Sequence, residues 1–338
     1  MRTTGIAVLA ATTLAVAACG GSGGGDERSI VISGSSTVQP ISVAVGDAFP
    51  GDADITVDGP GTGDGFQLFC AGEIDIADAS RPIHADDPEE GGICEENGIG
   101  YVELRIGIDG LTVMTSAANP DPPACLAFAD LYALVGPESE GFDSWSDADA
   151  LAAEVGAPNA PYPDRPLDVA GPGEESGTYD SFVEIALKGI AESRVEAGAL
   201  EEDLAGSTRA DYDASSDDNQ IVAAVEGSES SLGWVGFGVA ESAGDGIREV
   251  PVSDGESDCV APTPDTIRSG DYPLSRSLYL YVNLASAAEK PVVAEFVDYY
   301  LGDGLSAVEA SGYVALSEED VAATRQAWED RATGAREG

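Results

Sequence analysis

Histidine and basic residues are scarce in this sequence. It has 338 residues, with one His, 62 acidic residues and only 15 basic ones, and a formal net charge of -47. Without a basic tract, it lacks the surface that nucleic acids and anionic membranes require. Without further histidines, it lacks the parts of most metal centres and of histidine-dependent catalysis. We therefore expect no metal, no cofactor and no nucleic-acid partner.

Long hydrophobic runs are also absent, apart from one near the N-terminus. Residues 5–18 form an apolar run that is too short for a bilayer core of roughly 30 Å. The run ends in Val-Ala-Ala before Cys19, which resembles a bacterial lipobox, and a glycine-rich stretch follows. We expect residues 1–18 to be a signal peptide and residues 19–28 to be a tether whose Cys19 carries lipid. The protein would then sit on the outer face of the cytoplasmic membrane, whereas an ordinary signal peptide with an incidental Cys is the alternative.

Cysteine is sparse, but its number is informative. Four cysteines remain after Cys19, an even number that suits an oxidising compartment, and four cysteines permit three pairings. Cys70 and Cys94 would close a short loop, which leaves Cys125 and Cys259 as the second pair. A zinc site is the competing explanation, but the sequence has no Cys-x-x-Cys motif.

Strand-like and helix-period segments alternate along the chain, which is typical of an α/β fold with a largely parallel sheet. The sequence predicts strands at residues 28–32, 54–57, 74–77, 167–170, 232–237 and 277–282. It predicts helices at residues 38–49, 65–71, 126–135, 147–155, 179–189, 219–225, 291–300 and 318–333. Residues 100–113 are predicted to form two adjoining strands around the turn-prone pair Asp109-Gly110.

Three strand-to-helix junctions share glycines and small hydroxyl residues. They are residues 33–37 (SGSST), 59–65 (GPGTGDG) and 171–178 (GPGEESGT). A helix N-terminus has unpaired N–H groups and a positive dipole, so it can hold an anion. Glycine lets the backbone approach the ligand, and hydroxyls add donors. Simple N-capping explains any single junction, but three together favour an anion site.

A cation follows the third predicted strand. Ser80 and Arg81 lie at its carboxyl end, the edge of an open α/β sheet where ligands bind. The planar guanidinium of Arg81 can bind two oxygens of a tetrahedral oxyanion. An ion pair of Arg81 with Asp75 or Asp78 is the alternative.

These segments together resemble the phosphate-binding protein of the bacterial phosphate ABC transporter. The similarity is carried, in order, by residues 33–40 (SGSSTVQP), the glycine loop up to Phe66, and residues 73–83 (EIDIADASRPI), 108–113 (IDGLTV), 171–180 (GPGEESGTYD) and 209–219 (RADYDASSDDN). The resemblance implies a two-lobed, periplasmic-binding-protein-like α/β fold of type II, with mixed sheets flanked by helices and the ligand in the inter-lobe cleft. It also implies a monomeric receptor that delivers inorganic phosphate to a membrane permease and touches the membrane only through its lipid anchor.

The resemblance assigns phosphate contacts to both lobes. They are Ser35, Ser36, Thr37, Thr62, Gly63, Ser80 and Arg81 from one lobe, and Ser176, Gly177 and Thr178 from the other. Another branch of the family has Asp at the place of Ser80 and Arg near the place of Pro172. The carboxylate that accepts the phosphate proton must therefore come from elsewhere here, and Asp180 is our choice. Asp64 and Asp78 are fallbacks, and stabilisation of its own helix terminus is the alternative role of Asp180.

The lobe boundaries are expected where the chain crosses between lobes. Lobe one would comprise residues 29–107 plus 275–338, and lobe two residues 108–274. Each predicted disulfide then lies within one lobe. The other pairings would tie the lobes together and oppose a hinge motion.

Other functions compete with phosphate binding. A receptor of the same fold for sulfate, molybdate or another tetrahedral oxyanion is the main alternative, and a proton acceptor in the site would separate the two. An exported hydrolase that uses carboxylates or Ser176 is a second alternative, but no His lies beside a candidate nucleophile. A structural or adhesive lipoprotein would leave the three junctions unexplained. We therefore expect a binding protein rather than an enzyme.

Overall fold

The computed structural model describes residues 28–84 and 91–334. The predicted signal peptide, Cys19 and all of the tether but its last residue lie outside these ranges. Within the ranges, none of the helices combines the length and the apolar character that a membrane crossing requires.

Lobe one contains both ends of the described chain. Its elements are β1 (Ser29–Gly34), α1 (Gln39–Ala48), β2 (Asp54–Asp58), α2 (Thr62–Cys70), β3 (Ile76–Ala79), α3 (Gly91–Glu96), α11 (Leu284–Glu289), α12 (Pro291–Tyr300), α13 (Ser306–Ala310) and α14 (Glu318–Glu329). β1 pairs in parallel with both β2 and β3. Helix α1 has Pro40 in its first turn, where no N–H partner is needed, and it buries Ile41 and Val45 in the core.

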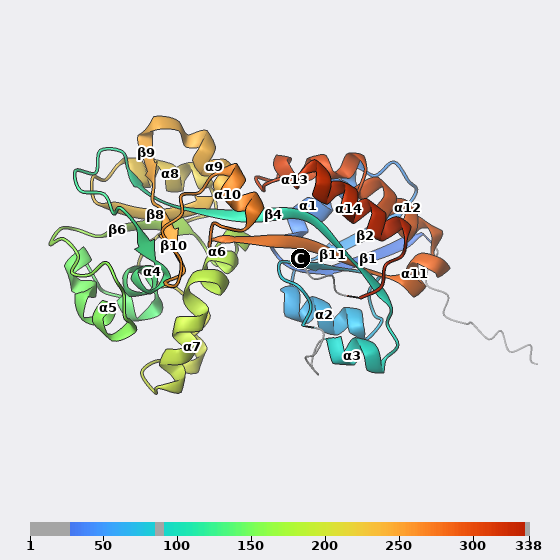
Figure 1. Cartoon of the computed structure of the whole chain (residues 1–338), viewed down its shortest axis with the longest axis horizontal. Helices are drawn as coiled ribbons and strands as arrows, with labels where there is room; N and C mark the ends of the chain where they lie inside the picture. Colours follow the sequence, from blue (N-terminus) through green and yellow to red (C-terminus); the bar gives the residue numbers. More distant parts are fainter. Residues whose placement is uncertain (1–27, 85–90, 335–338) are drawn as a thin grey trace, which may run out of the picture.

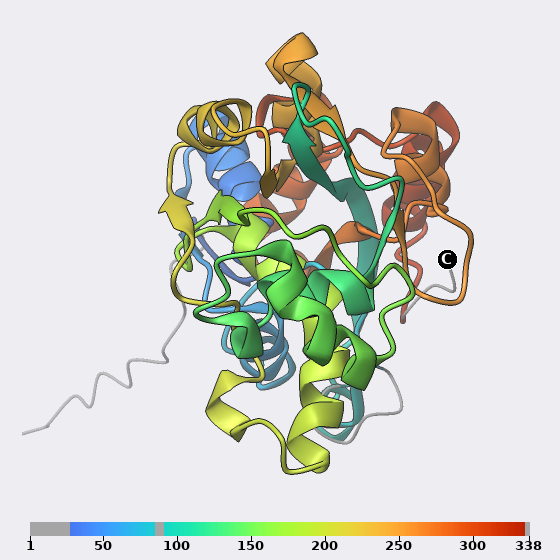
Figure 2. The ribbon, with the colours of Figure 1, turned by 90° about the vertical axis from the view of Figure 1, so that its left-hand side faces the viewer.

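Lobe two is built from the middle of the chain. Its elements are β5 (Leu126–Ala127), α4 (Phe128–Val135), α5 (Asp149–Val155), β6 (Asp168–Pro172), α6 (Gly177–Phe182), a π-helical turn (Val183–Leu187), α7 (Lys188–Glu196), β7 (Asp213–Ser215), α8 (Asp218–Glu226), β8 (Ser231–Gly236), α9 (Phe237–Ala243), β9 (Ile247–Glu249), β10 (Val252–Ser253) and α10 (Pro264–Ser269). Figure 2 looks onto this lobe, with its green helices toward the viewer. Phe182 stacks on Trp234 in its core, with ring centroids 4.5 Å apart.

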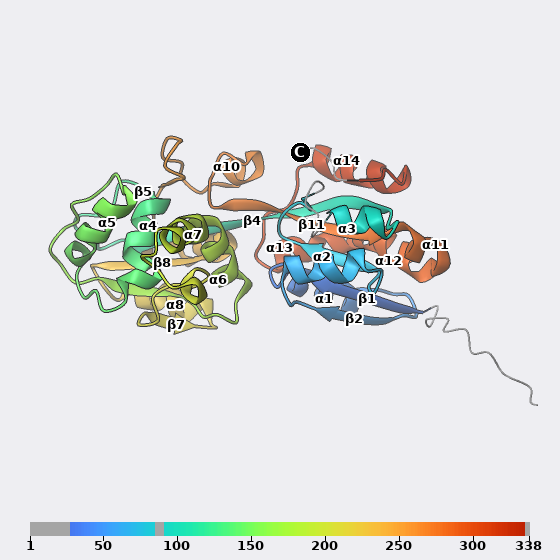
Figure 3. The same cartoon turned by 90° about the horizontal axis from the view of Figure 1, so that it is seen from below.

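Two long strands join the lobes (Figures 1 and 3). They are β4 (Tyr101–Ser116) and β11 (Ser275–Asn283), which pair antiparallel between the lobes. Within the described ranges, nine of the eleven strands form one sheet in the order β2-β1-β3-β11-β4-β8-β6-β7, with β9 also on β4, and β5 and β10 form a separate two-stranded sheet. The sheet is mixed, as the predicted fold class states. That two-lobed α/β fold is confirmed, whereas the lobe boundaries at 107/108 and 274/275 stay a prediction.

The predicted turn at Asp109-Gly110 is wrong, because β4 runs through this pair without a break. Gly110 is needed for packing: a Cβ there would lie 2.8 Å from Cδ1 of Ile267. Asp109 is buried and lies opposite Arg276 in the ladder between β4 and β11.

Two helix predictions need smaller corrections. The helix predicted from residue 126 begins at Phe128, because Leu126 and Ala127 pair with β10 as a short strand. The helix predicted at 179–189 begins earlier and continues through the π-helical turn into α7.

Both predicted disulfides are confirmed. Cys70, the last residue of α2, is bonded to Cys94 in α3, and Cys125 before β5 is bonded to Cys259 after β10. Each bridge links elements of a single lobe, so neither crosses the two strands that join the lobes.

A third segment also connects the lobes. After α13, the backbone of Val314 makes two hydrogen bonds of 2.9 Å with Ile108 in the middle of β4. Val314 and Leu316 pack into the core of lobe two before the chain returns to lobe one in α14. We call residues 313–316 the strap.

Candidate functional site

A pocket of about 420 Å³ lies between the two lobes, where the three predicted junctions approach one another. We call it the cation pocket. Its lining residues are Ser35, Ser36, Thr37, Pro60, Gly61, Thr62, Gly63, Ser80, Arg81, Asp180, Val183, Glu184, Lys188, Gly206 and Arg276. Eight residues of the predicted site are among them, together with three basic side chains of a chain that has only 15.

The loop between β1 and α1 forms one wall of the pocket. Gly34 has a φ of 147°, and a Cβ on it would lie 2.0 Å from the carbonyl oxygen of Asp78, so only glycine fits this close approach. The Ser35 N–H donates to the same carbonyl at 2.8 Å. Within the described residues, the N–H groups of Ser36 and Thr37 donate to no protein acceptor. The loop therefore offers backbone and hydroxyl donors from a fixed frame.

The end of β3 and the start of α2 form a second wall. The hydroxyls of Thr62 and Ser80 lie 3.0 Å apart, and the Ser80 N–H donates to Thr62 Oγ1 at 3.2 Å. The Arg81 guanidinium carbon lies 5.4 Å from the ring centroid of Phe66, so the ring supports this cation from one side. Hydroxyls and a guanidinium thus lie next to one another.

The two acidic neighbours proposed as alternative partners of Arg81 have other contacts. Asp75 accepts two hydrogen bonds from Lys290 Nζ, at 3.0 and 2.9 Å. Asp78 is buried and accepts a hydrogen bond of 3.1 Å from Ser42, and burial raises its pKa to about 7. Arg81 approaches Glu184 instead, with Nε 3.9 Å from a carboxylate oxygen.

Lobe two closes on the first wall through direct contacts. The Ser36 hydroxyl donates to Asp180 Oδ2 at 2.6 Å, and the Thr37 hydroxyl donates to the Gly177 carbonyl at 3.2 Å. A Cβ on Gly177 would lie 2.8 Å from Thr37 Cα, so the glycine permits the approach. The predicted acceptor Asp180 therefore lies in the pocket and contacts a hydroxyl from the opposite lobe.

The third predicted junction lies beside the pocket rather than in its lining. Ser176 caps α6, since its hydroxyl accepts from the Thr178 N–H at 3.2 Å. Gly177 packs against Thr37. Ser176, Gly177 and Thr178 are thus the predicted site residues that do not line the cation pocket in this closed arrangement.

Arg276 is a pocket residue that was not predicted from the sequence. This residue lies on β11 between the lobes, and its Nη2 donates to Thr37 Oγ1 at 3.1 Å and to Ser181 Oγ at 2.6 Å. Its Nε lies 3.6 Å from an oxygen of Asp109. Burial raises the pKa of Asp109, and the charge of Arg276 and the hydrogen bond from Ser181 offset only part of that rise. Arg276 therefore contacts both lobes from the strand that joins them.

Glu184 and Lys188 were missed as well. They follow Asp180 at intervals of four residues, so the three side chains project from one face of the helical segment α6 to α7. Glu184 forms an ion pair with Arg276 Nη1. The spacing of four residues after a predicted site residue was the signal in the sequence that could have found both.

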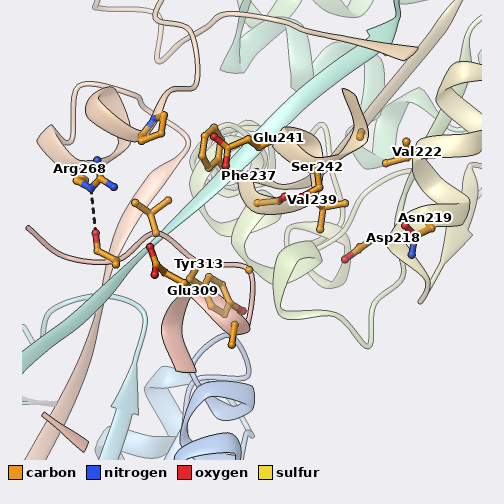
Figure 4. A pocket seen from close by; sticks show the side chains of 17 residues that line it. Asp218, Asn219, Val222, Phe237, Val239, Glu241, Ser242, Arg268, Glu309 and Tyr313 are labelled. Atoms are coloured by element: carbon orange, nitrogen blue, oxygen red, sulfur yellow. Dashed lines mark hydrogen bonds between the residues drawn. The ribbon is translucent and has the colours of Figure 1, made fainter. Parts of the chain in front are cut away.

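A larger groove of about 540 Å³ lies elsewhere between the lobes. Acidic side chains outnumber basic ones in its lining, the reverse of the cation pocket (Figure 4). We call it the acidic groove. Asp218, Glu241 and Glu309 line it with a single cation, Arg268, whose Nε donates to the Ala315 carbonyl at 3.3 Å. Burial, and then Asp217, raise the pKa of Asp218. The groove is larger than the cation pocket but is unsuited to an anion.

Comparison with known proteins gives consistent matches. Residues 20–303 match a family model described as a PBP superfamily domain. Protein SphX of Synechocystis sp. (strain ATCC 27184 / PCC 6803 / Kazusa) is 36% identical over 320 residues, which cover 93% of this chain and 86% of that protein. Phosphate-binding protein PstS of Staphylococcus aureus (strain USA300) is 31% identical over 315 residues, covering 91% and 86%. The crystal structure of a possible phosphate binding protein from Planctomyces limnophilus superposes with a TM-score of 0.76 at 35% identity, covering 90% of this chain and 98% of that one.

Proposed function

This chain belongs to the PBP superfamily and to the group of phosphate-binding proteins within it, and we propose that it binds inorganic phosphate outside the cytoplasm for uptake by an ABC transporter. The observation that carries the proposal is the composition of the cation pocket. Hydroxyls, N–H donors and three basic side chains converge there in a protein whose formal net charge is -47. An anion is the ligand that such a pocket recognises.

The contacts come from the predicted residues that line the pocket. Hydroxyls are supplied by Ser35, Ser36, Thr37, Thr62 and Ser80, and backbone donors by the Ser36–Thr37 loop and by Gly63 at the start of α2. Arg81 supplies the principal charge. Ser176, Gly177 and Thr178 stand at the N-terminus of α6, which contacts Thr37 directly, and in this proposal they reach phosphate when the ligand separates α6 from that wall.

Asp180 makes the site selective for phosphate over sulfate. Near neutral pH, phosphate carries at least one P–OH and sulfate carries none, so a carboxylate in the pocket gains a hydrogen bond from phosphate alone. A site that leaves a buried acceptor unpaired rejects the wrong ligand strongly. The two fallbacks fit less well, because Asp64 is exposed outside the pocket lining and Asp78 is buried beneath the loop.

The cellular setting follows from the N-terminal segment of the sequence. Residues 1–18 are removed, Cys19 is lipidated, and the monomeric receptor is held at the outer face of the cytoplasmic membrane, where it delivers phosphate to the permease. Mass spectrometry of the mature N-terminus tests the anchor. A lipidated Cys19 is expected, and a mature protein that begins at another residue contradicts it.

Binding without catalysis is part of the proposal. Ser176, the nucleophile of the hydrolase alternative, is engaged as the cap of α6. Isothermal titration with phosphate, sulfate and molybdate tests the whole proposal. Tight binding of phosphate with weak or no binding of the other two is expected. A preference for sulfate or molybdate would assign the pocket to another tetrahedral oxyanion.

A further inference from the structure

One carboxylate lies between two of the three cations of the pocket. Glu184 Oε1 is 3.9 Å from Arg81 Nε, and its other oxygen, Oε2, accepts a hydrogen bond from Arg276 Nη1. Arg81 belongs to lobe one, Glu184 to lobe two, and Arg276 to the strand that joins them. The two oxygens of this one side chain thus lie next to two cations, and the three residues come from three different parts of the fold.

We propose that Glu184 is an internal counter-ion of the anion site: it bridges Arg81 and Arg276 in the closed molecule, and bound phosphate must displace it. The inference rests on the proposed function, because it concerns the regulation of the same pocket. A carboxylate that spans two guanidiniums occupies the positions that two oxygens of a tetrahedral oxyanion would take. The two anions therefore compete, and Glu184 sets the affinity for phosphate below what the cations alone would give.

The exposure of the bridge allows its displacement. The side chains of Arg81 and Glu184 are 26% and 37% exposed, so the carboxylate reaches water by rotation of its own side chain. The pair of Arg194 with Glu138 in lobe two is a useful contrast. Its side chains are 17% and 18% exposed, and Glu138 also accepts hydrogen bonds from Arg194 Nε and Tyr132. Glu138 is thus half as exposed as Glu184 and is held by more hydrogen bonds. In the bridge, Arg276 is only 11% exposed, so the carboxylate of Glu184 is the group that moves when the bridge breaks.

The local backbone supports a special role for this residue. Glu184 is the second residue of the π-helical turn Val183–Leu187. Such turns are rare and occur frequently at functional sites. The bridge also joins the lobes, as does the hydrogen bond between Ser36 and Asp180. Glu184 therefore holds the molecule closed with the same cations that bind the ligand.

Titration of the variant Glu184→Gln tests the proposal. The substitution keeps the shape of the side chain and removes the charge that attracts both guanidiniums. If the bridge forms in nine molecules of ten, its loss strengthens phosphate binding by about tenfold. Glu192→Gln is the matched control, because Glu192 is exposed on α7 outside the pocket lining and loses the same charge. Its affinity for phosphate should equal that of the parent protein.

A second variant separates displacement from a general charge effect. In an Arg276→Met background the bridge lacks its closest cation, so Glu184→Gln should no longer strengthen phosphate binding. A full tenfold gain in that background would overturn the proposal. So would an unchanged affinity of Glu184→Gln in the parent background. A loss of phosphate affinity with a gain for sulfate would make Glu184 the proton acceptor instead.

A measurement without any anion distinguishes the inference from the proposed function. Small-angle X-ray scattering in phosphate-free buffer should show a larger radius of gyration for Glu184→Gln than for the parent and the Glu192→Gln control, because the lobes open. An unchanged radius would contradict the bridge. If the parent binds no phosphate in the titration, the proposed function fails, while an expanded Glu184→Gln still supports the bridge.

Discussion

The cation pocket and the acidic groove both lie between the lobes, yet only one of them suits an anion. The acidic groove is the larger, at about 540 Å³ against about 420 Å³. What separates them is the placement of a few cations: Arg81, Lys188 and Arg276 line the pocket, and Arg268 alone lines the groove. In a strongly acidic protein, the positions of the few basic side chains identify an anion site better than the volume of the pocket does.

The largest expected effect is the loss of the principal cation from the pocket. Arg81→Ala should weaken phosphate binding by about two orders of magnitude or more, since removing a hydrogen-bonded charged partner costs roughly 2–5 kcal/mol. Arg268→Ala, which removes the same side chain from the acidic groove, should leave the affinity unchanged. Isothermal titration of both variants makes the comparison. Equal losses in both variants would show that only net charge matters.

Asp78 is buried directly behind the cation pocket, so the stability of a variant at this position tests the pocket's side of the comparison. Burial raises its pKa from 3.8 to about 7, so the folded protein keeps a proton that the unfolded chain releases. The free energy of unfolding should therefore fall as pH rises from about 4 to about 7. Asp78→Asn lacks this loss, so its stability relative to the parent should rise by up to roughly 3 kcal/mol between about pH 5 and 8. Urea unfolding at the two pH values measures the difference, and parallel curves would contradict it.

Asp180 tests whether the pocket selects among anions. Asp180→Asn keeps an oxygen that can accept hydrogen bonds but removes the negative charge that strengthens the hydrogen bond from P–OH and repels sulfate. Phosphate affinity should fall by about tenfold, which corresponds to the cost of roughly one hydrogen bond, and sulfate should begin to compete. Competition titrations provide the measurement. An intact preference for phosphate would place the acceptor on another residue.

The smallest effect is expected in the acidic groove. Burial and the neighbouring Asp217 raise the pKa of Asp218, so Asp218→Asn should also gain stability relative to the parent as pH rises. Because Asp218 is only partly buried, the gain should be smaller than for Asp78→Asn. Unfolding curves at two pH values measure it, and phosphate selectivity should not change. A change in selectivity would mean that the groove takes part in binding.

Local features of the sequence predicted much of the fold and of the site. The junction of residues 33–37 could be recognised because a strand, a glycine and four hydroxyl residues lie within a few positions of one another. The disulfides followed from the cysteine count, the exported compartment and the expected lobes. The junction needs no knowledge of how distant segments pair, whereas the disulfides needed the lobes that the family resemblance implies.

The parts that sequence analysis missed depend on contacts between distant segments. Arg276 becomes a pocket residue only because the register of β11 on β4 sets it opposite Asp109. Gly110 looked like a turn residue, but its missing side chain makes room for Ile267, which is far away in sequence. Neither the register nor the packing partner is visible in a local window.

The strap has a mechanical consequence for the hinge. Two adjoining strands alone would let one lobe both bend and twist relative to the other. The bonds between Val314 and Ile108 attach the chain a third time, beside the strand pair. Twisting about the long axis of β4 would strain this attachment, whereas bending across the strand pair would not. We therefore expect the lobes to move mainly by bending, so that closure brings Ser36 back to Asp180 in the same register.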